Sequence, residues 1–415
     1  MNIAIEQSCP SCGASIVISE DDRLIQCSFC DVYNYRIGTT GSRYVLPSLL
    51  SNQVDANRLI YVPYLRFKGS IFYVRDNEIK YKIVDTTRLG VNNNLLPASL
   101  GLRPQAMKVK PVVSATPGAF ILQSVPTRNV FEHAAMIIDL FNEKNRKKTY
   151  HQAFIGETVS RIYHPCYLKD NQLLDAVNNR VMGQSSILKD HLAQTCSSKV
   201  SWEPRFITTI CPGCGGLLAG EPDSLVLQCK NCQSLWQEHK NRLISLKWKA
   251  VVAEEREAHY LPFWKITFST NGYILKTFGD YLRFTNQPLV VREDYDKQPL
   301  VFWIPAFKIH PKAFLQLASQ LTVAQGRIPS GKSMRLKNNY PVTLSRAEAH
   351  QAIKSVLAYS TVSKEKRFPL LPRLQVSETR CQLTYLPFIH QTHDLQQEHT
   401  FAVIQAAAIR FGRTL

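Results

Sequence analysis

The sequence predicts an α+β fold made of two tandem copies of one module, each with a four-cysteine metal site, a β-meander sheet and a packed helix. One observation behind this prediction is a pair of cysteine motifs whose matched cysteines all differ by 202 in residue number. Another is that strand-like and helix-like segments follow each motif in the same order. Self-similarity over so long a period is the signature of a repeated structural unit.

The two cysteine motifs read CPSCGASIVISEDDRLIQCSFC and CPGCGGLLAGEPDSLVLQCKNC, each with C-P-x-C-G, a gap of 14 residues and C-x-x-C. A C-x-x-C turn can direct two thiolates at one ion, and the gap suffices for a hairpin that brings two turns together into a tetrahedral site. The predicted ligands are Cys9, Cys12, Cys27 and Cys30 in the first motif and Cys211, Cys214, Cys229 and Cys232 in the second.

Both motifs resemble the zinc-ribbon, or rubredoxin-like, superfamily. The resemblance implies two structural Zn²⁺ ions, with iron as the rival metal because rubredoxin sites also use C-P-x-C-G turns. The short gap and the absence of another redox motif favour zinc. The resemblance implies no activity, because ribbons serve nucleic-acid binding, protein docking and structural stapling. As a whole, the chain also resembles bacterial two-ribbon proteins of unassigned activity.

Aromatic runs after each motif predict strands. Tyr61-Val-Pro-Tyr64 in the first copy matches Tyr260-Leu-Pro-Phe263 in the second. Because proline cannot donate a ladder hydrogen bond, Pro63 and Pro262 predict edge strands or bulges. Later in each copy, Tyr163-His-Pro-Cys166 matches Tyr385-Leu-Pro-Phe388. Hairpin turns are predicted at Lys68-Gly69-Ser70 and at Asn271-Gly272.

Helical spacing predicts a helix over 129–142, and Ser345 to Glu348 is a capping-box start for its counterpart in the second copy. A basic cluster follows each helix, at 143–148 and at 364–367, and either binds a partner or complements the helix C-terminus. Residues 106–111 and 306–311 form a further matched pair. The predicted domains are ribbon 1 at 1–45, an α+β domain at 46–200, ribbon 2 at 201–245 and an α+β domain at 246–415.

The net charge is +18, so an acidic partner such as nucleic acid is plausible. Residues 1–45 carry 3 Lys+Arg against 5 Asp+Glu, so the positive excess lies mostly outside the first motif. No apolar run approaches the roughly 18 residues of a membrane-spanning helix, and the N-terminus does not resemble a secretory signal. We therefore expect a cytoplasmic protein. The isolated thiols Cys166, Cys196 and Cys381 are predicted to be buried or inert.

GRIPSGKS, residues 326–333, fits the phosphate-loop pattern G-x-x-x-x-G-K-[ST]. A working loop needs a buried strand before it and a helix after it. Here Pro311 and the spacing of Phe314, Leu317 and Leu321 predict a helix before the loop. Pro341 argues against a helix after it. The pattern therefore favours an ordinary connecting loop, with nucleotide binding as the alternative.

Two further candidates have ordinary structural alternatives. His390, His393 and His399 could ligate a metal together with Asp394 or Glu398, although their spacing is more typical of an exposed polar loop. The aromatic strands could stack nucleic-acid bases or could form cross-strand pairs in a core, and the second reading is favoured. These aromatic residues are Tyr61, Tyr64, Phe67, Phe72, Tyr73, Tyr260, Phe263 and Trp264.

No serine-protease-like triad, paired carboxylates or H-E-x-x-H motif is recognisable in the sequence. We therefore expect a non-catalytic, zinc-stapled scaffold or adaptor that binds a protein partner, within a larger complex. Nucleic-acid binding through the basic surface and the ribbons is the alternative function.

Overall fold

The computed structural model describes residues 3–38, 41–48, 55–140, 148–192, 195–196, 202–254, 257–336 and 338–412. The chain divides into two compact units. Unit 1 comprises Met1–Lys68, Val84–Phe141 and Glu157–Thr209, and unit 2 comprises Gly69–Ile83, Asn142–Gly156 and Ile210–Leu415. Unit 2 thus includes two short pieces from the first half of the chain, which we call the arm.

The first cysteine motif folds into ribbon 1 (residues 3–37) of unit 1. β1 (Ala4–Ser8) pairs antiparallel with β2 (Ser15–Ser19), and β3 (Leu24–Gln26) pairs antiparallel with β4 (Tyr33–Ile37). A later strand, β14 (Arg205–Thr208), pairs with the other side of β4 and completes a three-stranded sheet.

The main sheet of unit 1 is built around two neighbouring long strands, β6 (Ile60–Arg75) and β10 (Thr149–Lys169). β5 (Ser42–Val45) pairs parallel with β10, and β11 (Gln172–Asp175) follows β10 in a hairpin. The other strands are β7 (Glu78–Leu89), β8 (Lys110–Pro111), β9 (Ala119–Ile121), β12 (Val181–Gln184) and β13 (Thr195–Cys196). The helices are η1 (Ala56–Arg58), α1 (Arg103–Ala106), α2 (Arg128–Leu140), η2 (Ser185–Leu188) and α3 (Lys189–Leu192).

The second cysteine motif folds into ribbon 2 (residues 210–246) of unit 2. Its strands form one four-stranded antiparallel sheet in chain order. They are β15 (Leu218–Ala219), β16 (Val226–Cys229), β17 (Leu235–His239) and β18 (Arg242–Leu246). β4 of ribbon 1 corresponds to β17 of ribbon 2. The neighbour of β17 is β18, the next strand in the chain, whereas the neighbour of β4 is β14, a strand from much later in the chain.

The main sheet of unit 2 is built around β20 (His259–Asn271) and β22 (Gln375–Gln391), which pair antiparallel. β19 (Trp248–Ala250) pairs parallel with β22, and β21 (Phe302–Pro305) pairs antiparallel with β20. β23 (Asp394–Gln397) and β24 (Val403–Gln405) extend the sheet beyond β22.

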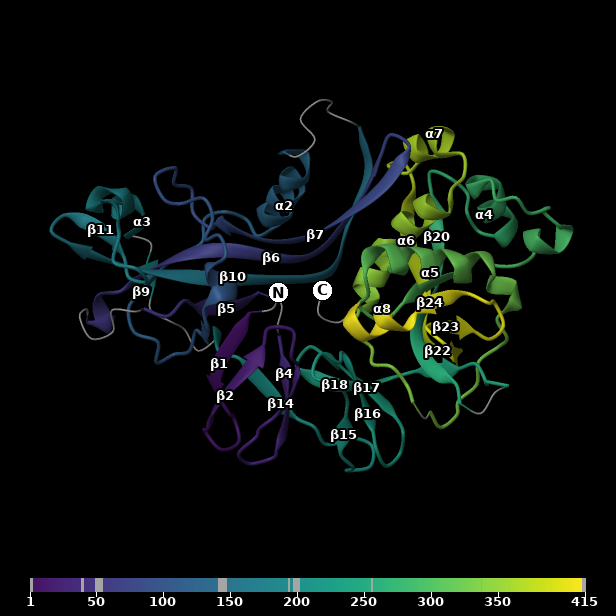
Figure 1. Ribbon diagram of the computed structural model, residues 1–415, viewed down its shortest axis with the longest axis horizontal. Coiled ribbons are helices and arrows are strands. Elements are labelled where there is room, and N and C mark those ends of the chain that lie inside the picture. Colours follow the sequence, from purple (N-terminus) through teal and green to yellow (C-terminus); the bar gives the residue numbers. More distant parts are fainter. Residues whose placement is uncertain are drawn as a thin grey trace. The chain divides into compact units, whose positions relative to one another are not determined.

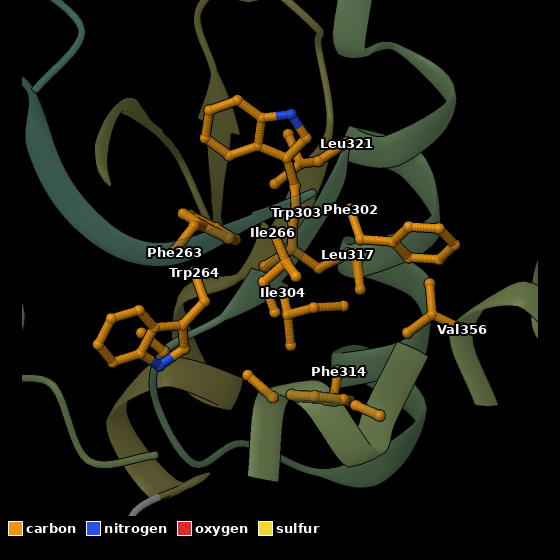
Figure 2. Packing of buried hydrophobic residues seen from close by; sticks show 14 of the residues in the cluster. Phe263, Trp264, Ile266, Phe302, Trp303, Ile304, Phe314, Leu317, Leu321 and Val356 are labelled. Carbon is orange, nitrogen blue, oxygen red and sulfur yellow. The ribbon is translucent and has the colours of Figure 1, made fainter. Parts of the chain in front are cut away.

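Helices α5 and α6 pack on this sheet (Figure 1). Figure 2 shows Ile266 of β20, Ile304 of β21 and Leu317 of α5 meeting in the core. Each such apolar side chain, once buried, contributes about 1.5–3 kcal/mol. The helices of unit 2 are α4 (Phe278–Thr285), η4 (Glu293–Asp296), α5 (Pro311–Val323), η5 (Gln325–Arg327), α6 (Arg346–Ser360), α7 (Lys364–Arg367), η6 (Phe368–Leu370) and α8 (Ala406–Phe411).

The arm is part of this core although it comes from the first half of the chain. The ring centroid of Phe72 lies 6.0 Å from that of Phe314 on α5, and Ile155 is buried in the same cluster. The backbone N–H of Gly156 donates to Glu348 Oε1 at the start of α6, at 2.8 Å. Apolar burial and a charge-assisted hydrogen bond therefore both attach the arm to unit 2.

The two main sheets share a strand arrangement and a register. β5 lies parallel to β10 with Val45 beside Tyr163, and β19 lies parallel to β22 with Ala250 beside Tyr385. In each sheet the long strand then continues into a three-stranded meander, β10–β11–β12 in unit 1 and β22–β23–β24 in unit 2. The matched motifs at 163–166 and 385–388 therefore occupy the same place, and the predicted α+β class is confirmed.

The matched prolines lie in central strands, and this corrects the edge-strand prediction. Pro262 of β20 lies opposite Tyr385, between β21 and β22, and the bulge of β20 is elsewhere, at 267–268. The Pro262 carbonyl accepts the N–H of Ala306 at 2.9 Å. The carbonyl of Ala306 accepts the N–H groups of Thr343 and Leu344, just before α6. The carbonyl of Ala306 therefore does not need a hydrogen bond from residue 262, and a proline without an N–H group is tolerated there.

Unit 1 repeats the same hydrogen bonds. The N–H of Gly90 donates to Pro63 at 2.8 Å, and the carbonyl of Gly90 accepts from Ser124 and Val125, just before α2. Gly90 therefore corresponds to Ala306. Residues 106–111, which the sequence matched to 306–311, contain β8 and not a helix start, so that match is wrong.

The predicted helices and turns had different outcomes. Helix α2 covers 129–140 of the predicted helix, whose last two residues lie outside the described residues, and the capping box of Ser345 and Glu348 begins α6 as predicted. Lys68–Ser70 lie inside β6, whose hairpin turn comes later at Asp76, and Asn271–Gly272 lead into α4. Both hairpin predictions are therefore wrong, because the strands continue past the first glycine and a helix follows the second.

Candidate metal centres

In ribbon 1 the four cysteine sulfurs converge. Cys9 Sγ lies 3.9 Å from Cys30 Sγ, and Cys12 Sγ lies 3.7 Å from Cys27 Sγ. All four sulfurs lie within 4.8 Å of one another. Four thiolates at about 2.3 Å from one tetrahedral zinc ion would be about 3.8 Å apart. The observed spacing therefore fits a four-thiolate site.

Ribbon 2 gives the same geometry. Cys211 Sγ lies 3.8 Å from Cys232 Sγ, and Cys214 Sγ lies 3.5 Å from Cys229 Sγ. These four sulfurs also lie within 4.8 Å of one another. The two C-x-x-C turns that were far apart in sequence are thus brought together by the β15–β16 region in the same way as in ribbon 1.

Each cysteine turn closes on a residue with left-handed backbone. Gly13 and Gly215 follow the first turns with φ of 78° and 74°, a conformation that glycine adopts without a steric cost. Their N–H groups donate to the carbonyls of Cys9 and Cys211, both at 2.9 Å. This is the reason why C-P-x-C is followed by glycine in both motifs.

Hydrogen bonds to sulfur favour the thiolate form that a metal needs. In ribbon 1 the N–H groups of Cys30 and Phe29 lower the pKa of Cys27 to about 7. In ribbon 2 the hydroxyl of Ser234, 2.9 Å from Cys232 Sγ, lowers the pKa of Cys232 to about 6. Each site thus contains one thiol whose pKa lies below the ordinary value of a free cysteine.

The residues around the sulfurs differ between the sites and were not singled out from the sequence. In ribbon 2, Trp236 Nε1 donates to Ser234 Oγ at 2.8 Å, which leaves the hydroxyl proton free for Cys232. At the corresponding place in ribbon 1, Asn34 exchanges hydrogen bonds with Ser11. The signal in the sequence for this sulfur environment was Ser234, two residues after the last cysteine, followed by Trp236.

A buried ionic cluster ties ribbon 1 to the main sheet of unit 1. Arg66 of β6 is fully buried, donates twice to Asp85 at 2.8 Å and also pairs with Glu20 in ribbon 1. Beside it, Lys68 Nζ lies 3.5 Å from an oxygen of Asp21. The acidic run that gives residues 1–45 a negative charge is therefore used within the unit. Its partners are 46 residues or more away in sequence, so no local pattern revealed them.

The phosphate-loop candidate has the predicted flanks. Helix α5 precedes it, η5 overlaps its first two residues, and irregular backbone follows it among the described residues. Lys332 exchanges two backbone hydrogen bonds of 2.9 Å with Ala250 of β19. Its N–H is thus used in a strand-like bridge and is not available to cradle an anion.

The histidine candidates do not converge. His390 pairs with Leu395 across the β22–β23 hairpin, while His399 lies near the neighbouring Glu398. Among the residues that the structure describes, the two cysteine groups are the only ligand sets close enough for one ion. Of the isolated thiols, Cys166 is fully buried, and Cys196 and Cys381 are partly exposed.

The remaining candidates have structural roles where they are described. All eight aromatic side chains of the candidate strands are buried, which confirms the core interpretation. The basic cluster at 143–148 lies outside the described residues except for Lys148. In the second cluster, Arg367 donates to the carbonyl of Arg283 at 3.1 Å and lies over the ring of Phe284.

Comparisons with protein-family models, with curated proteins and with solved structures found no match. Within the described ranges, none of the helices has the length and apolar composition required to cross a bilayer. What supports the two metal centres is therefore the convergence of the cysteines themselves.

Proposed function

We propose that this chain is a non-catalytic, zinc-bound adaptor that arose by tandem duplication and presents two related modules to a protein assembly. Each four-cysteine group would hold one structural zinc ion, which would be shown by metal analysis giving about two zinc ions per chain. The observation that carries the proposal is the common register of the two sheets, each adjoining its own four-cysteine ribbon. Two linked modules bind one assembly at a high effective concentration.

The second cysteine turns of the two ribbons differ in the side chains that they expose to solvent. Ribbon 1 exposes Phe29, Val32 and Tyr33 at its second cysteine turn, with exposed fractions of 71%, 44% and 38%. We call these three residues the apolar knuckle. The corresponding residues of ribbon 2 include the polar Asn231 and Ser234. Exposed apolar groups of this kind are typical of protein-interaction sites, so ribbon 1 is the proposed contact for a partner with a complementary apolar surface.

The test is capture from host cells with the full-length protein and two variants. Phe29→Asn gives the knuckle the polarity of ribbon 2, and Val181→Asn changes another exposed apolar residue, in β12, as the control. We expect a defined protein to be recovered with the wild type and the control and to be depleted about tenfold or more with Phe29→Asn. Zinc content should be equal in all three. Equal recovery with all three proteins would contradict the proposal.

Nucleic-acid binding is the second candidate, favoured by the net charge of +18. Salt dependence separates the two. Binding to phosphates should fall by several decades between about 50 and 200 mM salt, whereas an interface with apolar anchors should lose much less. Tight binding of a DNA or RNA probe with that steep salt dependence would favour the second candidate over the adaptor.

A further inference from the structure

Two arginines lie side by side on one face of the unit 1 sheet. Arg43 of β5 is directly beside Arg161 of β10 in parallel register, so both side chains leave the same face. Among the described residues, neither guanidinium forms an ion pair with a carboxylate. Like charges at neighbouring positions of a sheet destabilise it unless something compensates them.

Both guanidinium groups are held in place. The plane of Arg43 lies over the ring of Trp202, 3.8 Å from its centroid. Arg161 donates from Nε to Gln123 Oε1, and Gln123 is itself fixed by a 2.6 Å bond from its Nε2 to the carbonyl of Val125. Among the described residues, no hydrogen bond engages the terminal nitrogens of Arg161, and the bond from Nε to Gln123 orients them.

The environment leaves donors unused. Arg43 Nη1 is buried, and no described residue accepts a hydrogen bond from it. Burial, together with the charge of Arg43, lowers the pKa of Arg161. The buried Tyr163 is the next residue of β10 on the same face, close to the Arg43 side chain. Unpaired buried donors are costly, and such groups are normally satisfied by a partner.

Unit 2 shows that the fold does not require these charges. The two positions that correspond to Arg43 and Arg161 are occupied by Trp248 and Leu383, in the same parallel register. Val342 corresponds to Gln123. Each of these residues comes immediately before the two N–H groups that donate to one carbonyl, that of Gly90 in unit 1 and that of Ala306 in unit 2. Three positions that are polar or charged in unit 1 are thus apolar in unit 2.

We propose that Arg43 and Arg161 form a binding site for the phosphate group of a phosphomonoester. The planar fork of a guanidinium matches phosphate oxygens in pairs. Two such forks match the charge of a phosphomonoester dianion, whereas a carboxylate or a phosphodiester carries one negative charge. Gln123 and Trp202 act as positioning residues that orient the two forks. The site does not depend on the proposed adaptor function.

The test exchanges residues between the two halves of the chain. Arg161→Leu and Arg43→Trp install the side chains that unit 2 carries at these positions, so both variants are expected to fold. Arg180→Leu, at an exposed position of unit 1, is the charge-matched control. Binding to the full-length, zinc-loaded protein is measured by calorimetry in a phosphate-free buffer. The probes are inorganic phosphate, phenyl phosphate and a short single-stranded RNA without terminal phosphates.

We expect phosphate and phenyl phosphate to bind the wild type and Arg180→Leu at one site. Affinity should fall about tenfold or more in either exchange variant, because one fork is lost. Without ligand, Arg161→Leu should melt at a temperature equal to or higher than the wild type, since the repulsion is removed. No phosphate binding by the wild type, or equal binding by Arg161→Leu, would overturn the proposal. Tighter binding of the RNA than of phenyl phosphate, lost in Arg161→Leu, would overturn the assignment to a phosphomonoester.

Discussion

Unit 2 buries its apolar side chains in one continuous cluster, which joins the β20–β22 sheet to α5, α6 and the arm. Among the described residues of unit 1, apolar side chains form smaller, separate clusters, two of which lie on opposite faces of the β6–β10 sheet. The two sheets have the same register, so the difference lies in what covers them. A divided core leaves unit 1 more dependent on other interactions than unit 2 is.

The two units also differ at one matched position of their long strands. Arg66, paired with Glu20 and Asp85, corresponds to Lys265 in unit 2, whose ammonium lies 5.3 Å from the ring centroid of Trp303. One sheet architecture therefore accepts either an ion cluster or a single cation over an aromatic ring. The ion cluster makes unit 1 sensitive to the loss of any one member, since an unpaired buried charge is costly.

The ribbons contribute unequally to the cores. In unit 1, Ile5, Ile18 and Ile25 of ribbon 1 belong to the same apolar cluster as Tyr64 and other residues of the main sheet. In unit 2, among the described residues, ribbon 2 supplies two buried residues to the main cluster, Val226 and Leu235. Metal loss should therefore unfold more of unit 1 than of unit 2.

The largest predicted effect follows from breaking one metal site at a time. Cys27→Ser and Cys229→Ser each remove one ligand, and structural zinc contributes about 10–16 kcal/mol in comparable sites. Hydrogen exchange followed by mass spectrometry should show loss of protection in β6 and β10 for Cys27→Ser. For Cys229→Ser the loss should be confined to β15–β18, with β20 and β22 still protected. Equal loss in both main sheets, or in neither, would contradict the unequal roles of the ribbons.

A smaller effect is expected from the matched cations of the two sheets. Arg66→Ala leaves the buried Glu20 and the partly buried Asp85 without their partner, and such a loss costs about 3–5 kcal/mol. Lys265→Ala should cost about 1 kcal/mol, because only the contact with Trp303 is removed. Urea unfolding followed by exchange in each sheet measures both. If Lys265→Ala cost as much as Arg66→Ala, the contrast between an ionic and an apolar unit would be wrong.

The features that could be predicted from the sequence are those with local signals. Cysteine spacing, the capping box of α6 and the spacing of α2 are set by residues a few positions apart. The repeated Tyr-x-Pro-aromatic strands were recognised for the same reason. The central position of these strands in the sheets was not predicted. In unit 2 the residue that pairs with Pro262 is Ala306, which lies more than 40 residues further along the chain.

Other features depend on distant pairings. β14 precedes the second motif as β1 precedes the first, yet it pairs with β4 of ribbon 1, and its own sequence does not specify that partner. The arm is attached through Phe72, which packs against Phe314 of α5, and through Gly156, which donates to Glu348 at the start of α6. The Arg43–Arg161 pair arises only once β5 lies beside β10. In each case the register of long strands determines the neighbours.

The smallest predicted effect concerns Asp175, which corresponds to Gln397 in unit 2. Burial opposes ionisation of Asp175, but hydrogen bonding and charge from His164, the N–H of Val177 and the charge of Arg103 outweigh it and lower the pKa to about 2. The ordinary value is about 3.9. A depressed pKa stabilises the folded state above that ordinary value, and the contribution is lost as the pH falls towards 2.

Asp175→Asn should therefore remove about 1–2 kcal/mol of stability near neutral pH and make unit 1 less dependent on pH between about 4 and 2. The measurement is the difference in unfolding free energy between wild type and variant across this range. Protonation of the cysteines affects both proteins equally and therefore cancels in the difference. Unit 2 already carries an amide at this position, with Gln397 Oε1 accepting from the N–H of Thr400 at 2.7 Å, so the variant is expected to fold. A difference that stayed constant from pH 5 to pH 2 would mean that Asp175 stabilises unit 1 through packing and not through its charge.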